Sequence, residues 1–266
     1  MSLKSALFFA SLALGHVIQP RSFSCQSPQL TQEQVEVAQQ MSIKEKSMRK
    51  SGMTIQASIS VDVWLHAVSA SESGLSSDSA LQKQFDTLQQ TFSPYNINLN
   101  YAGKTKTVNA EWANEGNDQE MPMKKSLRRG NYQSMNIYIV DVLPTASGYC
   151  YYPTNAPEGS NAFFTDGCTL AKSAMGPIAA HEAGHWLGLA HTFDGNNCDG
   201  AGDNVDDTPA QSGPSSGCPA SRDSCPNHPG NDPIHNYMDY TSPDCWTEFT
   251  PGQIDRVNSQ WNKYRA

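Results

Sequence analysis

Residues 181–191 read HEAGHWLGLAH, and the fold and chemistry of the chain depend on this stretch. On a helix, His181 and His185 lie four residues apart, so both imidazoles project from one face, about 5–6 Å apart at Cβ. That separation suits two ligands of one zinc ion. Gly188 can adopt the positive φ that ends a helix, which lets the chain turn and bring back His191 as a third nitrogen ligand. Three nitrogen ligands leave one position of the zinc ion open.

Glu182 follows the first histidine and lies beside the pair on the same helix. A water in the open position has its pKa lowered towards about 7, and a carboxylate can take its proton as the water attacks a carbonyl carbon. We therefore predict that Glu182 is the general base of amide hydrolysis and later the general acid. The alternative is an ordinary helix with core or surface histidines, but chance would produce these five letters in only about one chain in 10⁵.

A second stretch, NYMDY at residues 236–240, adds a methionine turn downstream of the histidines. The histidine spacing and this turn resemble the metzincins, in particular the secreted fungal members of the pappalysin family. The resemblance covers about residues 20–266 and is most specific from residue 166 onward. Further similar stretches are GCTLAKSAM (167–175), DNVDDTPAQ (203–211), SGCPASRDSCP (216–226), DPIHNYMDY (232–240) and TEFTPGQIDRV (247–257).

The resemblance implies an α/β (α+β) metzincin-like fold. Its upper subdomain would carry a twisted, mixed five-stranded sheet and two long helices, and its lower subdomain would be small, irregular and disulfide-stapled. The cleft between them would hold zinc and an extended substrate. Met238 would form a hydrophobic floor beneath the metal without binding it. Tyr240 resembles a tyrosine that hydrogen-bonds the tetrahedral oxyanion, with a packed structural tyrosine as the alternative.

The periodicity of apolar residues agrees with a mixed sheet. Alternation from Thr54 to Leu65 predicts a first strand, and helical spacing predicts a helix at 79–92 that stops at Ser93-Pro94. The other expected elements are strands at 96–101, 105–112 and 133–143, an edge strand at NAFFTDGC (161–168), a helix at 171–189 and a last helix at 251–264 capped by Thr250. Residues 191–237 contain few aliphatic side chains, so we expect staples or ions to hold them.

The sequence predicts that the chain has three parts. Residues 1–19 have a lysine followed by a short apolar run, which is typical of a signal peptide and too short to span a membrane. The alternative is a buried N-terminal helix. Residues 20–50 are polar and Gln-rich, which indicates a pro-segment or, alternatively, a solvated first helix of the mature domain. Residues 51–266 form the catalytic domain, with the upper subdomain ending near residue 188 and the lower one spanning 189–266.

Six of the seven cysteines lie beyond position 149, which favours an oxidising compartment. Six cysteines allow 15 connectivities, and the resemblance implies two of the pairs, after which one pair remains. These pairs are Cys198 with Cys225, Cys218 with Cys245, and Cys150 with Cys168. Cys25 is left over in the expected pro-segment, where its thiolate could fill the open zinc position and hold the enzyme latent. An intermolecular disulfide and an inert thiol are the alternatives.

An acidic cluster follows His191 closely. Carboxylates this close repel one another unless they are solvated or bind a hard cation such as calcium. A solvated acidic loop is the alternative to a calcium site. Similarity to calcium-dependent relatives favours calcium, with Asp203, Asp206 and Asp207 as its candidate ligands.

Composition excludes some functions. The 266 residues hold 18 basic and 26 acidic residues, a net charge of −8, and have no basic block, so a nucleic-acid partner is not expected. We predict a secreted, monomeric zinc endopeptidase that acts on proteins or peptides and does not span a membrane. The alternatives are a secreted zinc-binding module without turnover and a zinc amidase that acts on small molecules.

Overall fold

The computed structural model describes residues 23–53, 58–114 and 118–266. The predicted signal peptide and the start of the first expected strand lie outside these ranges. Within them, no helix is both long enough and apolar enough to cross a membrane.

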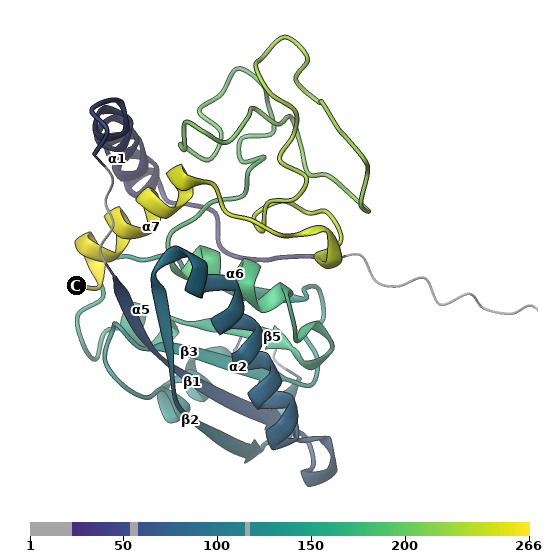
Figure 1. The fold of residues 1–266 in the computed structure, drawn as a ribbon. Coiled ribbons are helices and arrows are strands. Elements are labelled where there is room, and N and C mark those ends of the chain that lie inside the picture. Colours follow the sequence, from purple (N-terminus) through teal and green to yellow (C-terminus); the bar gives the residue numbers. More distant parts are fainter. Residues whose placement is uncertain (1–22, 54–57, 115–117) are drawn as a thin grey trace, which may run out of the picture.

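A five-stranded mixed sheet forms the centre of the upper region, by which we mean the described residues 58–188 (Figure 1). The strand order is β2-β1-β3-β5-β4, and only β4 runs antiparallel to its neighbour. This confirms the expected fold class. The strands are β1 (Ile59–Ser69), β2 (Ile97–Val108), β3 (Met135–Val140), β4 (Gly148–Cys150) and β5 (Cys168–Ala171).

Helices cover both faces of this sheet. Alternate residues of β1, including Val61, Val63 and Leu65, belong to a buried cluster with the apolar faces of α2 (Asp78–Phe92) and α6 (Ile178–Trp186). The other face packs against α3 (Ala110–Ala113) and α4 (Glu120–Leu127). Strand alternation therefore positions α6 on the sheet. At nine residues, α6 is shorter than the expected helix at 171–189, because Ala171 still belongs to β5, residues Lys172–Ala174 form a 3₁₀ turn, and the helix begins only at Ile178.

The two strands expected at 96–101 and 105–112 are one continuous strand, β2. The register of β1 and β2 shifts between Val63 and Trp64, where Tyr101 and then Gly103 are the partners. Gly103 has a φ of +146° and leaves no room for a Cβ against the Trp64 ring, so glycine allows the strand to continue through a bulge. Trp112 lies in helix α3, and the expectation of a strand there is wrong.

The edge strand expected at residues 161–168 is also wrong. Residues Asn161–Thr165 form helix α5, because the Ser160 side chain accepts a hydrogen bond from the Phe163 amide and caps the helix. Strand β5 begins only at Cys168 and lies inside the sheet, and the edge strand is β4. The disulfide between Cys150 and Cys168 joins these two neighbours.

The lower region, residues 189–266, is irregular until its last helix. Between α6 and α7 (Pro251–Tyr264), the described chain forms turns, an isolated bridge and a 3₁₀ turn at Pro243–Cys245. Helix α7 has the predicted bounds and the predicted Thr250 cap, which accepts from the Gln253 amide. Two disulfides, Cys198–Cys225 and Cys218–Cys245, cross the loops, so both pairings implied by the resemblance are present, as is the remaining pair Cys150–Cys168.

A helix from the N-terminal segment lies against the last helix. Figure 1 shows α1 (Gln32–Lys50) beside α7, far along the chain from it. The Arg256 guanidinium donates to both carboxylate oxygens of Glu45, and both side chains are buried. Arg49 forms ion pairs with Asp206 and Asp255. Charged side chains therefore attach residues 32–50 to the lower region.

Candidate metal centre

The end of α6 directs the three histidines of the motif to one place. Gly188 has a φ of +96°, as predicted, and donates its amide to the His185 carbonyl, while Leu189 donates to the Gly184 carbonyl. This pair of hydrogen bonds is a Schellman motif that ends the helix. The chain then reverses and returns His191 to the face that carries His181 and His185.

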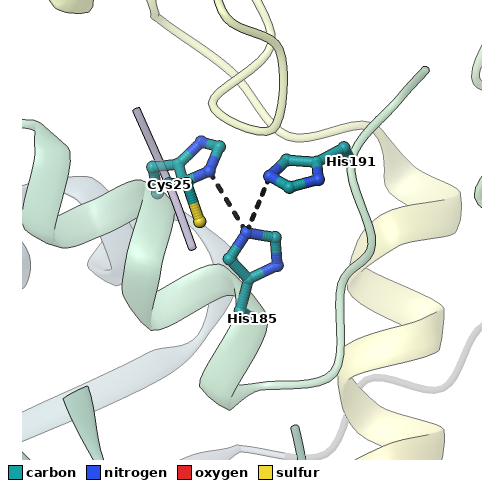
Figure 2. A group of neighbouring side chains, drawn as sticks. Cys25, His185 and His191 are labelled. Carbon is teal, nitrogen blue, oxygen red and sulfur yellow. Dashed lines mark hydrogen bonds between the residues drawn. The ribbon is translucent and has the colours of Figure 1, made fainter. Parts of the chain in front are cut away.

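The three imidazoles face one another through their Nε2 atoms. His185 Nε2 lies 3.2 Å from His181 Nε2 and 3.1 Å from His191 Nε2. In Figure 2 the rings of His185 and His191 point toward each other, and the sulfur of Cys25 points into the same space. The ligand atoms of all four residues lie within 4.8 Å of one another.

These nitrogens cannot satisfy each other as hydrogen-bond partners. His181 Nδ1 lies 2.6 Å from the Tyr237 carbonyl and His185 Nδ1 lies 2.7 Å from the Leu189 carbonyl. A carbonyl only accepts, so both Nδ1 atoms carry hydrogen and both Nε2 atoms carry lone pairs. Burial lowers the pKa of both histidines, which keeps them neutral. Converging lone pairs on neutral imidazoles fit a zinc ion.

Glu182 is fully buried next to this cluster. Its Oε2 accepts from the Cys25 thiol and from the Ser27 hydroxyl, both at 3.3 Å, and its Oε1 has no hydrogen-bond partner. Burial raises the pKa of Glu182 to about 8, although the two hydrogen bonds act in the opposite direction. The carboxyl group is therefore suited to take up and hold a proton near neutral pH.

The N-terminal segment crosses the site in an extended conformation. Ser147 donates its amide to the Ser24 carbonyl at 2.7 Å, and Gln26 donates to the Gly148 carbonyl at 3.0 Å, so the segment pairs with edge strand β4 in parallel orientation. Cys25 lies between these two bonds and is the free cysteine. Burial, and next the charge of Glu182, raise the pKa of its thiol.

Met238 and Tyr240 both lie beside the histidine cluster. Met238 is fully buried beneath α6, where its sulfur leaves no room for a Cβ at Gly184 between the two helical histidines. The Tyr240 ring lies 4.9 Å from the His191 ring, and its hydroxyl donates to the Cys25 carbonyl at 3.1 Å. Burial raises the pKa of Tyr240, so it remains a hydrogen-bond donor at any ordinary pH.

The sequence did not point to two further residues of the site. The buried Tyr152 has its hydroxyl 3.1 Å from His185 Nδ1, and Ser27 links Glu182 to the amide of Cys150. No spacing rule connects either residue to the histidines. Both are brought to the site by edge strand β4, whose position only the tertiary fold determines.

The three acidic residues proposed for calcium have other partners. Asp206 pairs with Arg49, and Asp207 accepts from the Thr250 hydroxyl and the Gly252 amide at the start of α7. Burial raises the pKa of Asp203 to about 7, and its Oδ1 already accepts from the Val205 amide and the Thr208 hydroxyl. Among the described residues, these acids do not gather into a metal-binding group. The calcium expectation therefore receives no support.

Three converging imidazoles beside a buried carboxyl, held between a mixed sheet and a disulfide-stapled region, define the class of zinc metallopeptidases. Comparison with known proteins gives the family. The profile of the pregnancy-associated plasma protein-A family matches residues 122–262. An extracellular metalloprotease of Podospora anserina is 45% identical over 267 aligned residues, covering 92% of this chain and 91% of that protein. One of Neurospora crassa is 42% identical over 284 aligned residues, covering 100% and 99%.

The chain therefore belongs to the pregnancy-associated plasma protein-A family of peptidases, the pappalysins. Solved structures agree with this assignment. Mature mirolysin of Tannerella forsythia, in complex with a cleaved peptide, has a TM-score of 0.62 at 26% identity and covers 76% of this chain and 90% of its own. A promirolysin mutant has a TM-score of 0.67 at 24% identity and covers 90% and 94%.

Proposed function

We propose that this protein is a secreted zinc endopeptidase in which His181, His185 and His191 bind the metal and Glu182 is the general base. The observation that carries the proposal is the convergence of three Nε2 atoms, because those of His181 and His185 carry lone pairs that point at each other and need a cation between them. The names of the fungal relatives support secretion and proteolysis, and so does the predicted signal peptide.

Two side chains of the protein, Glu182 and Tyr240, have separate roles in the proposed hydrolysis. A bound zinc ion supplies a Lewis acid that makes a water reactive at neutral pH and polarises the substrate carbonyl. Glu182 takes the proton of the attacking water and delivers it to the leaving amine. The Tyr240 hydroxyl, which donates to the Cys25 carbonyl, donates in the same way to the developing oxyanion.

We further propose that residues 20–50 are a pro-segment and that Cys25 holds the site closed. Its sulfur belongs to the group of ligand atoms formed with the three histidines. A thiolate in the fourth position would exclude water. The parallel pairing of residues 24–26 with β4 also covers the edge strand beside the histidines. The larger coverage by promirolysin than by mature mirolysin is consistent with such a segment.

The variant Glu182→Gln tests the general base. Expressed as the full chain and processed as the wild type, it should retain one zinc ion per chain and lose at least about 100-fold of casein-cleaving activity. Zinc content by mass spectrometry and cleavage of labelled casein measure the two effects. Undiminished activity would remove Glu182 from the mechanism. A zinc-loaded wild type that cleaves no protein would favour the binding module or the small-molecule amidase.

The variant Cys25→Ser tests latency on the unprocessed chain. Serine is a much weaker zinc ligand than thiolate, so unprocessed Cys25→Ser should cleave casein at least about tenfold faster than the unprocessed wild type. The matched control is Ser24→Ala, which retains the thiol and the backbone pairing. Equal activities of the unprocessed wild type and Cys25→Ser would refute the latency proposal while leaving the zinc endopeptidase in place.

A further inference from the structure

Phe23 of the N-terminal segment is seated in an aromatic recess beside the metal centre. Its ring makes edge contacts with His181 at 4.8 Å, Tyr240 at 4.9 Å and Trp246 at 5.3 Å between ring centroids. Trp246 is buried and stacks on the same His181 ring. The recess therefore shares one wall with a histidine of the metal centre, so its occupant lies next to the bond that would be cut.

A cavity adjoins Phe23 beside this recess. Phe23 lines one side of this cavity, which has a volume of about 470 Å³ and lies between the chain before β4 and the start of α6. Three polar residues, Asp141, Ser147 and Ser173, are also among its lining. The rest of the wall is apolar and includes Val142, Leu143, Ala146, Ala174, Ile178 and Pro243.

The N-terminal segment holds Phe23 as an extended peptide would be held. Residues 24–26 exchange backbone hydrogen bonds with β4, so side chains alternate between the two sides of the segment. Phe23 and Cys25 are two residues apart and therefore point to the same side, Cys25 to the histidines and Phe23 to the recess. Along the extended segment, the recess therefore lies two residues from the position that faces the metal.

We infer that this recess selects the substrate by accepting a large apolar or aromatic side chain located within two residues of the cleaved bond. The inference rests on the proposed endopeptidase function and names its substrate class. An aromatic ring is the occupant that the segment itself supplies. The three rings that contact Phe23, together with the mainly apolar side chains of the adjoining cavity, favour a similar side chain from a substrate.

A basic side chain is the competing occupant. Asp141 is the acidic residue among the cavity's lining residues, and its Oδ2 already accepts from the Ser69 hydroxyl and the Ala70 amide. A lysine or arginine would have to pass the apolar wall and share this carboxylate. If the occupant is basic, Asp141→Asn should weaken the preference, and if the occupant is apolar, the same substitution should leave the preference unchanged. This variant therefore separates the two occupants.

The test uses the full chain, loaded with zinc, processed by trypsin and then freed of trypsin activity by a serine-protease inhibitor. Casein fragments and a mixture of unbiased peptides are sequenced by mass spectrometry. We expect one position within two residues of the cut to be enriched about 10- to 100-fold in Phe, Tyr, Leu or Met over Gly, Ser or Asp. Enrichment in Lys or Arg, or no enrichment at any position, would overturn the inference and leave the endopeptidase standing.

Two variants of the cavity sharpen the result. Ala146→Phe fills the half-buried wall and should shift the selected position toward smaller side chains, lowering Phe cleavage at least about tenfold. Asp141→Asn is the matched control, and it should leave the preference unchanged. The inference would be contradicted if Ala146→Phe left the preference intact or if Asp141→Asn alone altered it.

A second measurement does not depend on catalysis. In the unprocessed chain, the rate at which iodoacetamide modifies Cys25 reports how often the segment leaves its site. Phe23→Ala and Phe23→Arg should raise this rate several-fold, and Phe23→Leu should leave it near the wild-type rate. A slower rate in Phe23→Arg than in Phe23→Leu would overturn the apolar preference. If no casein is cleaved at all, the endopeptidase proposal fails, and these rates still decide what the recess prefers.

Discussion

The upper and lower regions bury their side chains by different means. The upper region surrounds its sheet with aliphatic side chains, and nearly all the large, fully buried ones, such as Leu65 and Leu81, lie there. The lower region buries polar groups instead. The buried Asp239 accepts from Gln211 and from the Ser215 amide, and two disulfides cross its loops. The metal centre lies where these regions meet, with two histidines on α6 and the third just beyond it.

The comparison shows that the two sides of the metal centre are stabilised differently: the upper side by a buried aliphatic core and the lower side by disulfides and polar networks. Burial of aliphatic surface stabilises the sheet at roughly 25 cal/mol per Å² without any directional bond. Loops that lack aliphatic residues need covalent links or satisfied polar networks to stay ordered. We therefore expect substitutions in the core of the sheet to lower the free energy of unfolding of the whole molecule. Substitutions in the lower loops should first reduce zinc binding at the metal site.

The largest expected effect is on the sheet. Leu65→Ala removes a fully buried side chain from the inner strand β1 and should lower the free energy of unfolding by about 3–5 kcal/mol. Ile234→Ala, in the lower region and outside both main apolar clusters, should lower it by about 1–2 kcal/mol. Urea unfolding followed by circular dichroism measures both. Equal losses would contradict the proposed difference between the regions.

The next effect concerns the disulfides. Replacing both Cys218 and Cys245 with alanine should cost about 2–4 kcal/mol, because the unfolded chain regains the freedom of the closed loop. Since Cys245 precedes Trp246, which stacks on His181, zinc retention should fall before the circular dichroism of the sheet changes. Zinc content after dialysis and limited proteolysis are the measurements.

The pair Cys150 and Cys168 is the matched control in the upper region. Strands β4 and β5 already hydrogen-bond to each other, so the double alanine variant should leave zinc retention closer to that of the wild type. If this variant lost zinc first and the Cys218 and Cys245 variant did not, the Cys218–Cys245 disulfide would not be what keeps the lower loops ordered around the metal site.

Acid should weaken the sheet through His66. This buried side chain contacts the Thr105 hydroxyl and the Asn136 side-chain carbonyl, and burial lowers its pKa to about 4. Between pH 6.5 and 4 the unfolded chain binds a proton that the folded chain does not, so the His66 contribution is complete above pH 6.5 and falls as the pH drops. The loss by pH 4 is up to about 3 kcal/mol.

The variant His66→Gln measures this contribution. The free energy of unfolding of the wild type should fall between pH 7.5 and pH 4 by up to about 3 kcal/mol more than that of the variant. Urea titrations at the two pH values give the difference, which also cancels the titration of the metal-site histidines. A variant with the same pH dependence as the wild type would show that His66 is not responsible.

The smallest effect is at the join between the lower loops and α7. Asp207 accepts from the Thr250 hydroxyl and the Gly252 amide, both at 2.7 Å, so its charge lies at the positive end of the helix. Asp207→Asn should cost about 0.5–1 kcal/mol by thermal unfolding. Asp199→Asn, whose side chain is 95% exposed, is the control and should change little. A control effect as large as that of Asp207→Asn would exclude capping as the cause.

Local pattern explains most of what could be predicted. The fold class follows from the HEAGHWLGLAH and NYMDY stretches, whose resemblance also implied the disulfides at Cys198–Cys225 and Cys218–Cys245. Helix α7 was predicted with its cap because Thr250-Pro251 is a local signal. The strand errors arose where local propensity and pairing disagreed. The bulge at Gly103 continues β2, and pairing with β3 turns residues 168–171 into a strand.

The sequence by itself determined the metal ligands we propose, because three histidines and a helix-ending glycine within 11 residues act through short-range geometry. Only the tertiary structure decided what surrounds them. Phe23, Ser27 and Tyr152 reach the site through the pairing of the N-terminal segment with β4 and through the position of β4 at the sheet edge. The contacts of Ser27 with Glu182 and of Phe23 with His181 join residues more than 100 positions apart, and no local pattern of letters records them.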